Sequence, residues 1–331
     1  MARIFLTHIP NMLQNYYGER AVAALRKLGD VKINTSDHVL NAKALFEASK
    51  GCDIIVSDRQ TPGPGEFFAM GPDAVAFLRC AVDIRNIDVA AASKQGILVT
   101  HATPGFIASV SEQTIGMIVD CARNMSEYVM DYRTGKMPAA RPGHQLKGAT
   151  LGIMGYGDIG QYLAPLGLAL GMTVMISDPF KKIEDPKLKQ VDLRTLLCES
   201  DFVVCLVVAN KKTENLMNEV AFAQMKKTAY FINVSRGNLV DEDALIRALD
   251  NKVIAGAAMD VGRAQDQMPS LKLARRADVI ATPHSAGLTP QAIEHQAFDT
   301  VNQVAELVAG RIPPGAANPD AAHKLSRLRK G

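Results

Sequence analysis

Two side chains able to bind anions and move protons each follow an apolar run in the C-terminal half of the chain. Arg236 comes just after AYFINV and opens a turn with a glycine, and His284 follows DVIAT behind Pro283. An arginine can grip an anion with its bidentate fork, and a histidine can carry a proton near pH 7. Ligands bind at the carboxyl ends of strands in open α/β sheets, so the two positions favour an anion-binding, proton-transferring site. Each residue alone could instead be structural.

A glycine-rich turn adds a second chemical feature. Gly155, Gly157 and Gly160 form a G-x-G-x-x-G pattern between the apolar run LGIMG and a helical segment. There the first glycine permits a tight turn, the second lets a pyrophosphate approach the backbone, and the third lets the helix pack on the strand. Asp178 ends the next apolar run, where an acid can accept bonds from a ribose and repel a 2′-phosphate. The pattern favours NAD over NADP, although two lysines follow; the alternative is a tight turn beside a surface aspartate.

Alternating apolar runs and helical patterns predict the elements that position these residues. Near-continuous apolar strands separated by helices indicate parallel sheets covered on both faces. So many runs exceed one ordinary sheet, and we expect two α/β units. The predicted strands are residues 2–8, 52–57, 77–81, 96–100, 151–155, 172–178, 202–208, 229–234, 253–260 and 278–282. Residues 108–124 and 241–250 are predicted helices, and the polar stretch 133–148 is a predicted loop.

The bulk properties narrow the class of protein. The 331 residues are 47% apolar and carry a net charge of +3, which is too weak to argue for nucleic-acid or membrane binding. No apolar run approaches the length of a membrane span, and the N-terminus resembles a first strand more than a signal peptide. The five cysteines are scattered, with no CxxC pair, so we expect reduced thiols in a cytoplasmic protein and no metal site.

Several longer stretches identify a family by resemblance. INVSRGNLVDEDAL, AGAAMDV and TPHSAG, with GYGDIG and SDP before them, resemble the D-isomer-specific 2-hydroxyacid dehydrogenases. RNIDVAAASKQGILVTHATPG is similar to the segment that links the two domains of that family. The similarity runs from about residue 50 to about 300 and is most specific in 151–287, whereas the first 50 residues match only in pattern.

The resemblance implies a fold and a set of partners. It predicts an α/β protein of two Rossmann/flavodoxin-like doubly wound domains with a cleft between them. Residues 1–100 and 287–331 would form a discontinuous substrate-binding domain, and 101–286 would form the NAD-binding domain. The expected partner is a small 2-hydroxy or 2-oxo acid. A homodimer is also expected, because the predicted helix 108–124 lies where the family forms its dimer interface.

The resemblance also implies roles for particular residues. The family transfers hydride between C4 of NAD(H) and C2 of the substrate. Arg236 would bind the substrate carboxylate, His284 would exchange the proton, and Asp260 would hold the nicotinamide carboxamide. A fixed cation and an acid beside the carbonyl oxygen would stabilise the charge that hydride transfer leaves there. The positions assigned to the cofactor are Gly155, Tyr156, Gly157, Asp158, Ile159, Gly160, Asp178, Val207, Val208, Val234, Ser235, Arg236, Asp260, His284, Ala286 and Gly287.

The chain departs from the family pattern at the partner of the histidine. The family has Asp-Val-aromatic-x-x-Glu-Pro, and its Glu pairs with the histidine. Here Gly262 stands at the aromatic position, Gln265 at the Glu position and Asp266 at the Pro position. A glutamine can orient the ring but cannot ionise, whereas a shifted Asp266 could. We predict that Gln265 takes the usual place, with Asp266 as the alternative.

A second departure lies in the predicted substrate segment. The family has Gly-Val-Gly-x-Asp-Asn there, and its Val-Gly amides cradle the substrate carboxylate. This chain has Val82 and Asp83 at the amide positions and Arg85 two residues later, with Arg59 in SDRQTPG as a further cation. We predict that these residues bind substrate. The alternative is a local Asp83–Arg85 salt bridge that never meets it.

Two other functions compete with the leading one. Formate dehydrogenases of the superfamily resemble this chain in pairing a glutamine with the histidine, since formate gives up hydride without a proton transfer. Some other relatives use the fold as a non-catalytic, NAD-sensing interaction module. NADH formation from formate would favour the first, and tight NADH binding without turnover would favour the second.

Overall fold

The computed structural model describes residues 1–330 and divides them into two compact units. Unit 1 joins Met1–Gly105 to the chain from Thr289 onward, and unit 2 is Phe106–Leu288. The sequence prediction placed these divisions after residues 100 and 286, a few residues earlier in the chain.

Within the described chain, unit 1 contains a five-stranded sheet in the order β2-β1-β3-β4-β5. Every neighbouring pair is parallel. Because the chain starts at β1 and extends the sheet first on one side and then on the other, the strand order reverses between β1 and β3, where flavodoxin-like folds bind ligands. The strands are β1 (Ala2–Leu6), β2 (Gly29–Ile33), β3 (Ile54–Ser57), β4 (Ala76–Arg79) and β5 (Leu98–His101).

Alternate residues of these strands enter two apolar cores, one on each face of the sheet. On one face Ile4, Val56 and Leu78 pack with α2 and α13, and on the other Phe5 and Phe77 pack with α3, α4 and α5. The helices of unit 1 are α1 (Pro10–Tyr16), α2 (Glu19–Arg26), α3 (Ala42–Ala48), α4 (Gly65–Ala69), α5 (Val89–Lys94) and α13 (Pro290–Val308), with the 3₁₀ segments η3 (Pro319–Ala321) and η4 (His323–Lys330).

Unit 2 contains a seven-stranded parallel sheet in the described chain, in the order β12-β11-β10-β9-β6-β7-β8. Counted from β6, this is the Rossmann order 3-2-1-4-5-6 with one further strand at the edge. The order reverses between β6 and β9. The strands are β6 (Thr150–Met154), β7 (Thr173–Ser177), β8 (Leu188–Gln190), β9 (Phe202–Cys205), β10 (Tyr230–Asn233), β11 (Gly256–Met259) and β12 (Val279–Ala281).

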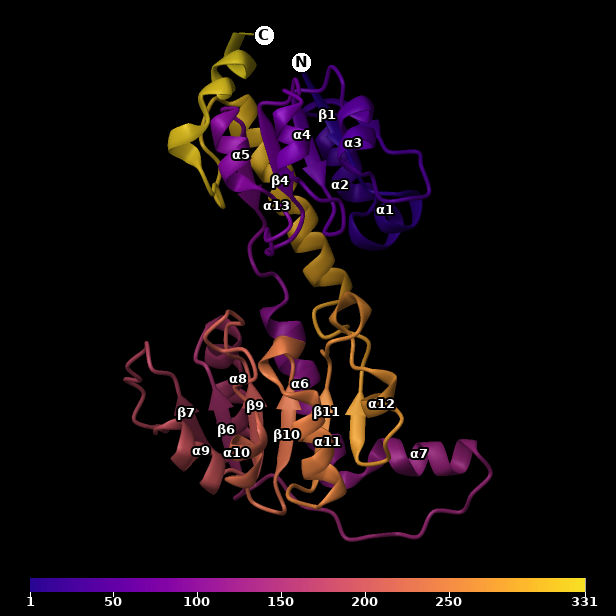
Figure 1. Cartoon of the computed structure of the whole chain (residues 1–331), viewed down its shortest axis with the longest axis vertical. Coiled ribbons are helices and arrows are strands. Elements are labelled where there is room, and N and C mark those ends of the chain that lie inside the picture. The colour runs from indigo at the N-terminus through magenta and orange to yellow at the C-terminus, as the bar shows by residue number, and fades with distance from the viewer. Residues whose placement is uncertain (331) are drawn as a thin grey trace. The chain divides into compact units, whose positions relative to one another are not determined.

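Helices cover both faces of this sheet (Figure 1). Helices α6 and α8 share one core with Ile153 and Val174, while α9 to α12 share the other with Val203 and Phe231. The helices are α6 (Ile107–Arg123), α7 (Met125–Arg133), α8 (Asp158–Ala169), α9 (Leu193–Glu199), α10 (Glu219–Ala223), α11 (Glu242–Asp250) and α12 (Leu271–Ala274), with η1 (Gly237–Leu239) and η2 (Gln265–Gln267).

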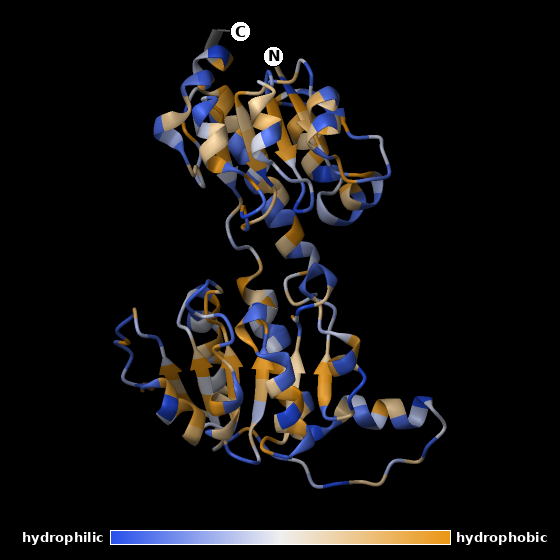
Figure 2. Cartoon of the chain, viewed as in Figure 1, coloured by the Kyte–Doolittle hydropathy of each residue, from blue (hydrophilic) through white to orange (hydrophobic). Residues whose placement is uncertain are grey.

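The predicted elements are confirmed, and two strands were missed. Each predicted strand is present, α6 and α11 occupy the predicted helices, and the polar loop follows the end of α7. The missed β2 and β8 are edge strands with exposed charged residues, which break the apolar pattern. Figure 2 shows that most of the visible strands are coloured as apolar.

Two further properties of the fold concern its cysteines and the apolar character of its helices. All five cysteines are free thiols, and Cys52, Cys80, Cys121 and Cys205 are buried. Among the described residues, no helix is long and apolar enough to cross a membrane.

Candidate active site

The glycine turn after β6 has the geometry that its pattern predicts. Gly155 has φ +90°, and a Cβ there would lie 2.9 Å from the carbonyl oxygen of Leu206, so only glycine fits. A Cβ at Gly160 would lie 2.7 Å from the carbonyl oxygen of Gly155, whereas one at Gly157 would meet nothing within 4 Å. Helix α8 begins at Asp158 without a side-chain cap. Its first N–H groups and the space at Gly157 therefore fit a pyrophosphate.

Asp178 ties the glycine turn to the next strand. Its Oδ2 accepts a hydrogen bond from the N–H of Tyr156 at 2.8 Å, and its Oδ1 accepts one from the N–H of Phe180 at 2.8 Å. A carboxylate can accept about four hydrogen bonds, so these two leave capacity for ribose hydroxyls. Of the other positions assigned to the cofactor, Val207 and Val208 follow β9, and Val234 and Ser235 follow β10.

Arg236 lies in a turn that a buried asparagine organises. Asn233, fully buried at the end of β10, donates to the carbonyl of Arg236 at 3.0 Å and accepts from the N–H of Ser235 at 3.1 Å. The Ser235 hydroxyl donates to the carbonyl of Val207 at 2.7 Å, and the Arg236 guanidinium donates to the carbonyl of Ser235 at 2.8 Å. Sequence reasoning missed Asn233, although a polar residue ending an apolar strand is a usable signal.

Asp260 is the buried carboxylate at the end of β11. It is 1% exposed, and its Oδ1 accepts from Gln113 at 3.0 Å, from the Thr282 hydroxyl and from the Ser285 N–H at 2.9 Å. Its Oδ2 accepts from the Ala286 N–H at 3.1 Å. The segment from Thr282 to Ala286 carries the histidine. These hydrogen bonds attach that segment to α6 and to the end of β11. The predicted contact with a nicotinamide carboxamide stays a prediction.

His284 is held by main-chain groups. Its N–H donates to the carbonyl of Asp260 at 2.8 Å, and its backbone has a left-handed φ of 53°. The ring Nδ1 lies 2.8 Å from the main-chain carbonyl oxygen of Asp266. A carbonyl only accepts, so Nδ1 carries a proton and Nε2 is the nitrogen left for proton exchange.

The ring contact of His284 in the structure differs from the side-chain partners that the sequence offered. Sequence reasoning offered the side chain of Gln265, or that of Asp266, but the ring contact in the structure is with the main-chain oxygen of Asp266. The Gln265 side chain is exposed and makes no hydrogen bond to another described residue. The physical reason is the left-handed backbone at Asp266 (φ 56°) and Gln267 (φ 60°), which sets the direction of the intervening carbonyl.

The residues predicted to bind substrate lie in unit 1, after β3 and β4. Asp83 and Arg85 form a local ion pair, with the Arg85 Nε 3.0 Å from both carboxylate oxygens. That geometry matches the local salt bridge that the sequence left open. The Arg59 guanidinium lies 5.3 Å from the centre of the Tyr16 ring, and Val82 is half-buried. A role for any of them in substrate binding stays a prediction.

Sequence reasoning missed a buried cluster of titratable residues in the same unit, formed by His8, Asp58 and Arg79. Arg79 is fully buried and donates to the carbonyl of Asp58 and, at 2.5 Å, to Oδ1 of Asn86. The carboxylate of Asp58 accepts from the hydroxyls of Thr7 and Thr61. The arginine lies inside FLRCA, whose other residues are all apolar and predict a buried strand. It braces the loop that carries Asp83 and Arg85.

The strand order, the glycine turn and the strand-end acid define unit 2 as a dinucleotide-binding α/β domain. A family model for the NAD-binding domain of the D-isomer specific 2-hydroxyacid dehydrogenases matches residues 115–286. The chain belongs to the D-isomer specific 2-hydroxyacid dehydrogenase family, as the sequence predicted, and NAD is its cofactor.

Relatives of several activities are similar to the chain. A glyoxylate reductase of Thermofilum pendens is 34% identical over 323 residues, covering 94% of this chain and 95% of the relative. A D-3-phosphoglycerate dehydrogenase of Synechocystis is 30% identical over 310 residues, which cover 91% of this chain and 55% of the relative. The chain thus spans about half the length of the phosphoglycerate dehydrogenases it matches.

A solved structure supports the fold and the cofactor class. The D-lactate dehydrogenase of Aquifex aeolicus, complexed with NAD and lactic acid, superposes with a TM-score of 0.77 at 28% identity. The match covers 93% of this chain and 96% of that protein.

Proposed function

We propose that the chain transfers hydride between NAD(H) and C2 of a 2-hydroxy or 2-oxo acid. The observation that carries this proposal is the set of groups after three parallel strands of one sheet: the glycine turn after β6, Arg236 after β10 and His284 after β12. An anion-binding cation and a proton-exchanging ring, beside a dinucleotide turn, are the groups that reduction of a 2-oxo acid requires.

The chain's own residues divide the work as follows. Arg236 binds the substrate carboxylate through its guanidinium and polarises the neighbouring carbonyl. His284 gives a proton from Nε2 to the carbonyl oxygen in reduction and takes it back in oxidation. The bound cofactor supplies or accepts the hydride. Because these groups act where charge develops, they stabilise the transition state more than the ground state.

The side chain of the substrate is a finer question. Glyoxylate, hydroxypyruvate, phosphoglycerate and sulfolactate name the activities of relatives. We propose a small 2-oxo acid, with Val82 and the Asp83–Arg85 pair beside it. The test is NADH oxidation against glyoxylate, hydroxypyruvate, pyruvate and longer 2-oxo acids, with NADPH in parallel. Absence of turnover across the panel, together with tight NADH binding, would replace the proposal with an NAD-sensing role.

We place the formate alternative second. It rests on a glutamine that pairs with the histidine, and the Gln265 side chain makes no such bond in the described chain. The decisive measurement is NADH formation from NAD and formate. Formation at a rate above that from any 2-hydroxy acid would restore this function.

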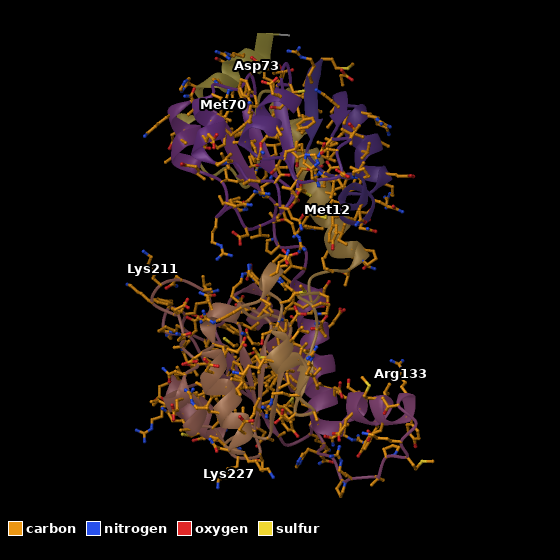
Figure 3. All side chains as sticks on the ribbon, turned by 45° about the vertical axis from the view of Figure 1, so that its right-hand side comes forward. Met12, Met70, Asp73, Arg133, Lys211 and Lys227 are labelled. Carbon is orange, nitrogen blue, oxygen red and sulfur yellow. The ribbon has the colours of Figure 1, made fainter. Side chains whose placement is uncertain are left out.

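We also propose that the chain forms a homodimer and works in the cytoplasm. Helix α7 has no buried residue, and Val129, Met130 and Tyr132 along it are 47%, 59% and 62% exposed. In Figure 1 α7 extends away from the sheet of its own unit, and Figure 3 shows Arg133 at its outer end. A second copy would cover this apolar surface. Light scattering tests the dimer, which Met130→Glu should weaken.

The five free thiols fit the proposed cytoplasmic location, because the cytoplasm is a reducing compartment.

A further inference from the structure

We propose that the main chain positions His284, and that Gly262 makes this possible. The loop from Gly262 to Pro269 presents the Asp266 carbonyl to the ring, in the place where the family uses a glutamate side chain. The role of His284 in catalysis rests on the proposed function, but the geometry of its support can be tested without it. Gly262 and the loop are positioning elements, since they act through the histidine.

The loop is closed by its own backbone. The Gly262 N–H donates to the carbonyl of Gln267 at 2.6 Å, and the Ala264 N–H donates to the carbonyl of Met268 at 3.0 Å. Asp266 and Gln267 both have left-handed φ values, which cost energy for residues with a side chain. The hydrogen bonds of the loop hold this strained pair, and the carbonyl of Asp266 is left to accept from the ring.

Gly262 is required for that closure. A Cβ at this position would lie 2.5 Å from Cα of Pro269 and 2.6 Å from the carbonyl oxygen of Met268. Both neighbours are backbone atoms and cannot move aside cheaply. Gly262, which stands at the family's aromatic position, is therefore required by a loop that folds back upon itself.

The same glycine places the turn that carries Arg236. A Cβ at Gly237 would lie 1.9 Å from the carbonyl oxygen of Gly262. Gly237 follows Arg236 directly, so the turn and the loop pack backbone against backbone. Close backbone packing thus connects Arg236, through Gly237 and Gly262, to the loop whose Asp266 carbonyl contacts His284. It sets the spacing between the anion-binding residue and the proton-exchanging residue.

The Asp266 carbonyl determines which tautomer the His284 ring adopts. A carbonyl cannot ionise and has no proton to give, so the neutral ring must stay in the Nδ1–H form. A solvated histidine has no such constraint. The tautomer of His284 is therefore a direct reporter of the loop, and it is measurable in the full chain without substrate.

The experiment records ¹⁵N NMR spectra of the histidine-labelled full chain, which has seven histidines. A His284→Asn spectrum assigns the His284 signals. The wild type should show the Nδ1–H form, and Gly262→Ala should lose it.

The kcat of Gly262→Ala for 2-oxo acids should fall by about 10²-fold, because a displacement of about 1 Å costs that much. Its Kd for NADH should rise by a much smaller factor than kcat falls, because the glycine turn after β6 is untouched. Gly116→Ala, where a Cβ meets nothing within 4 Å, is the matched control.

Three further variants separate the role of the Asp266 carbonyl from that of the side chains. Asp266→Gly keeps a carbonyl and suits a left-handed backbone, so the Nδ1–H form should persist. Gln267→Gly should also keep it, whereas the branched side chain in Gln267→Val should strain the loop and lose it. Loss of the signature in Asp266→Gly, with retention in Gln267→Val, would assign the ring to the Asp266 carboxylate and overturn the proposal. These variants decide the matter even if Gly262→Ala does not fold.

A failure of the function itself would look different. A chain that reduces no 2-oxo acid but keeps the predicted tautomer pattern would contradict only the proposed reaction. A chain that turns over, with a His284 tautomer indifferent to Gly262→Ala and Gln267→Val, would contradict only the positioning role.

Discussion

The two units hold the residues at the carboxyl ends of their strands by opposite means. In unit 1 a fully buried arginine, Arg79, lies in a buried cluster with Asp58 and His8. In unit 2 one buried carboxylate, Asp260, is surrounded by uncharged donors, and His284 is fixed by backbone groups. The stability of unit 1 should therefore fall strongly on loss of charge and in acid, whereas the stability of unit 2 should depend more on the shape of its backbone.

Removing the arginine should give the largest effect. Arg79→Met leaves the carbonyl of Asp58 and the Asn86 side chain without their donor and the buried Asp58 carboxylate without its nearby cation. Breaking a buried ionic arrangement from one side costs about 3–5 kcal/mol, so the free energy of unfolding should drop by that amount. Urea unfolding measures it, and hydrogen exchange locates it. A loss below about 1 kcal/mol, or one spread equally over unit 2, would end the contrast between the units.

Acid should be the next strongest perturbation of unit 1. Burial lowers the pKa of His8 from 6.5 to about 4, with Asp58 opposing the shift and Arg79 adding to it. Above pH 6.5 the ring is neutral in both folded and unfolded chains. Between pH 6.5 and 4 the unfolded chain gains a proton that the folded chain refuses, so stability falls, by about 3 kcal/mol in total. Unfolding free energies across that range check this.

The control for the acid experiment is His8→Phe, which keeps an apolar ring and removes the titration. Its stability should depend less on pH between 6.5 and 4. Burial raises the pKa of Asp58, but hydrogen bonds from Thr61 and Thr7 and the nearby His8 outweigh it and leave that pKa lowered. The carboxylate therefore protonates below this window. An equal pH dependence in His8→Phe would show that another group is responsible.

A smaller effect on stability is expected from the carboxylate of unit 2. Asp260→Asn turns one acceptor into an amide that faces an N–H or hydroxyl donor. One unsatisfied buried donor costs about 1–3 kcal/mol. The segment from Thr282 to Ala286 should loosen, so kcat should fall along with stability. Steady-state kinetics and urea unfolding on the same variant test this, and a fall in stability with intact kcat would separate Asp260 from the site.

The smallest effect should come from Gln265→Ala. The Gln265 side chain is exposed and does not bond the ring, so kcat should stay within about twofold of the wild type. A loss of tenfold or more would return the histidine's partner to this side chain, as the sequence predicted. It would also mean that the position of His284 depends on the Gln265 side chain and not on the main-chain carbonyl of Asp266.

The fold could be predicted largely from the sequence because buried parallel strands are continuous apolar runs. What escaped prediction were β2 and β8, where one-sided burial leaves charged residues in the run. Arg79 escaped for the converse reason, since it sits in a run that is otherwise apolar.

The features of the candidate site also differ in whether a sequence pattern can reveal them. The glycine turn, Arg236 and His284 carry side chains or spacings that a pattern can reveal. The Asp266 carbonyl cannot be found in this way, because every residue has a carbonyl and its direction depends on φ values such as those of Asp266 and Gln267. The bond from Gln113 to Asp260 spans 147 residues and depends on tertiary packing alone.

The bond between Asp178 and the Tyr156 N–H bears on attempts to redesign the coenzyme preference. Replacing this acid is the obvious way to admit a 2′-phosphate, since its charge repels one. Here the same carboxylate also shapes the phosphate-binding turn. A redesign therefore has to supply a new acceptor for the Tyr156 N–H before it adds cations. Otherwise the variant would lose affinity for both coenzymes and be misjudged as a failed exchange of specificity.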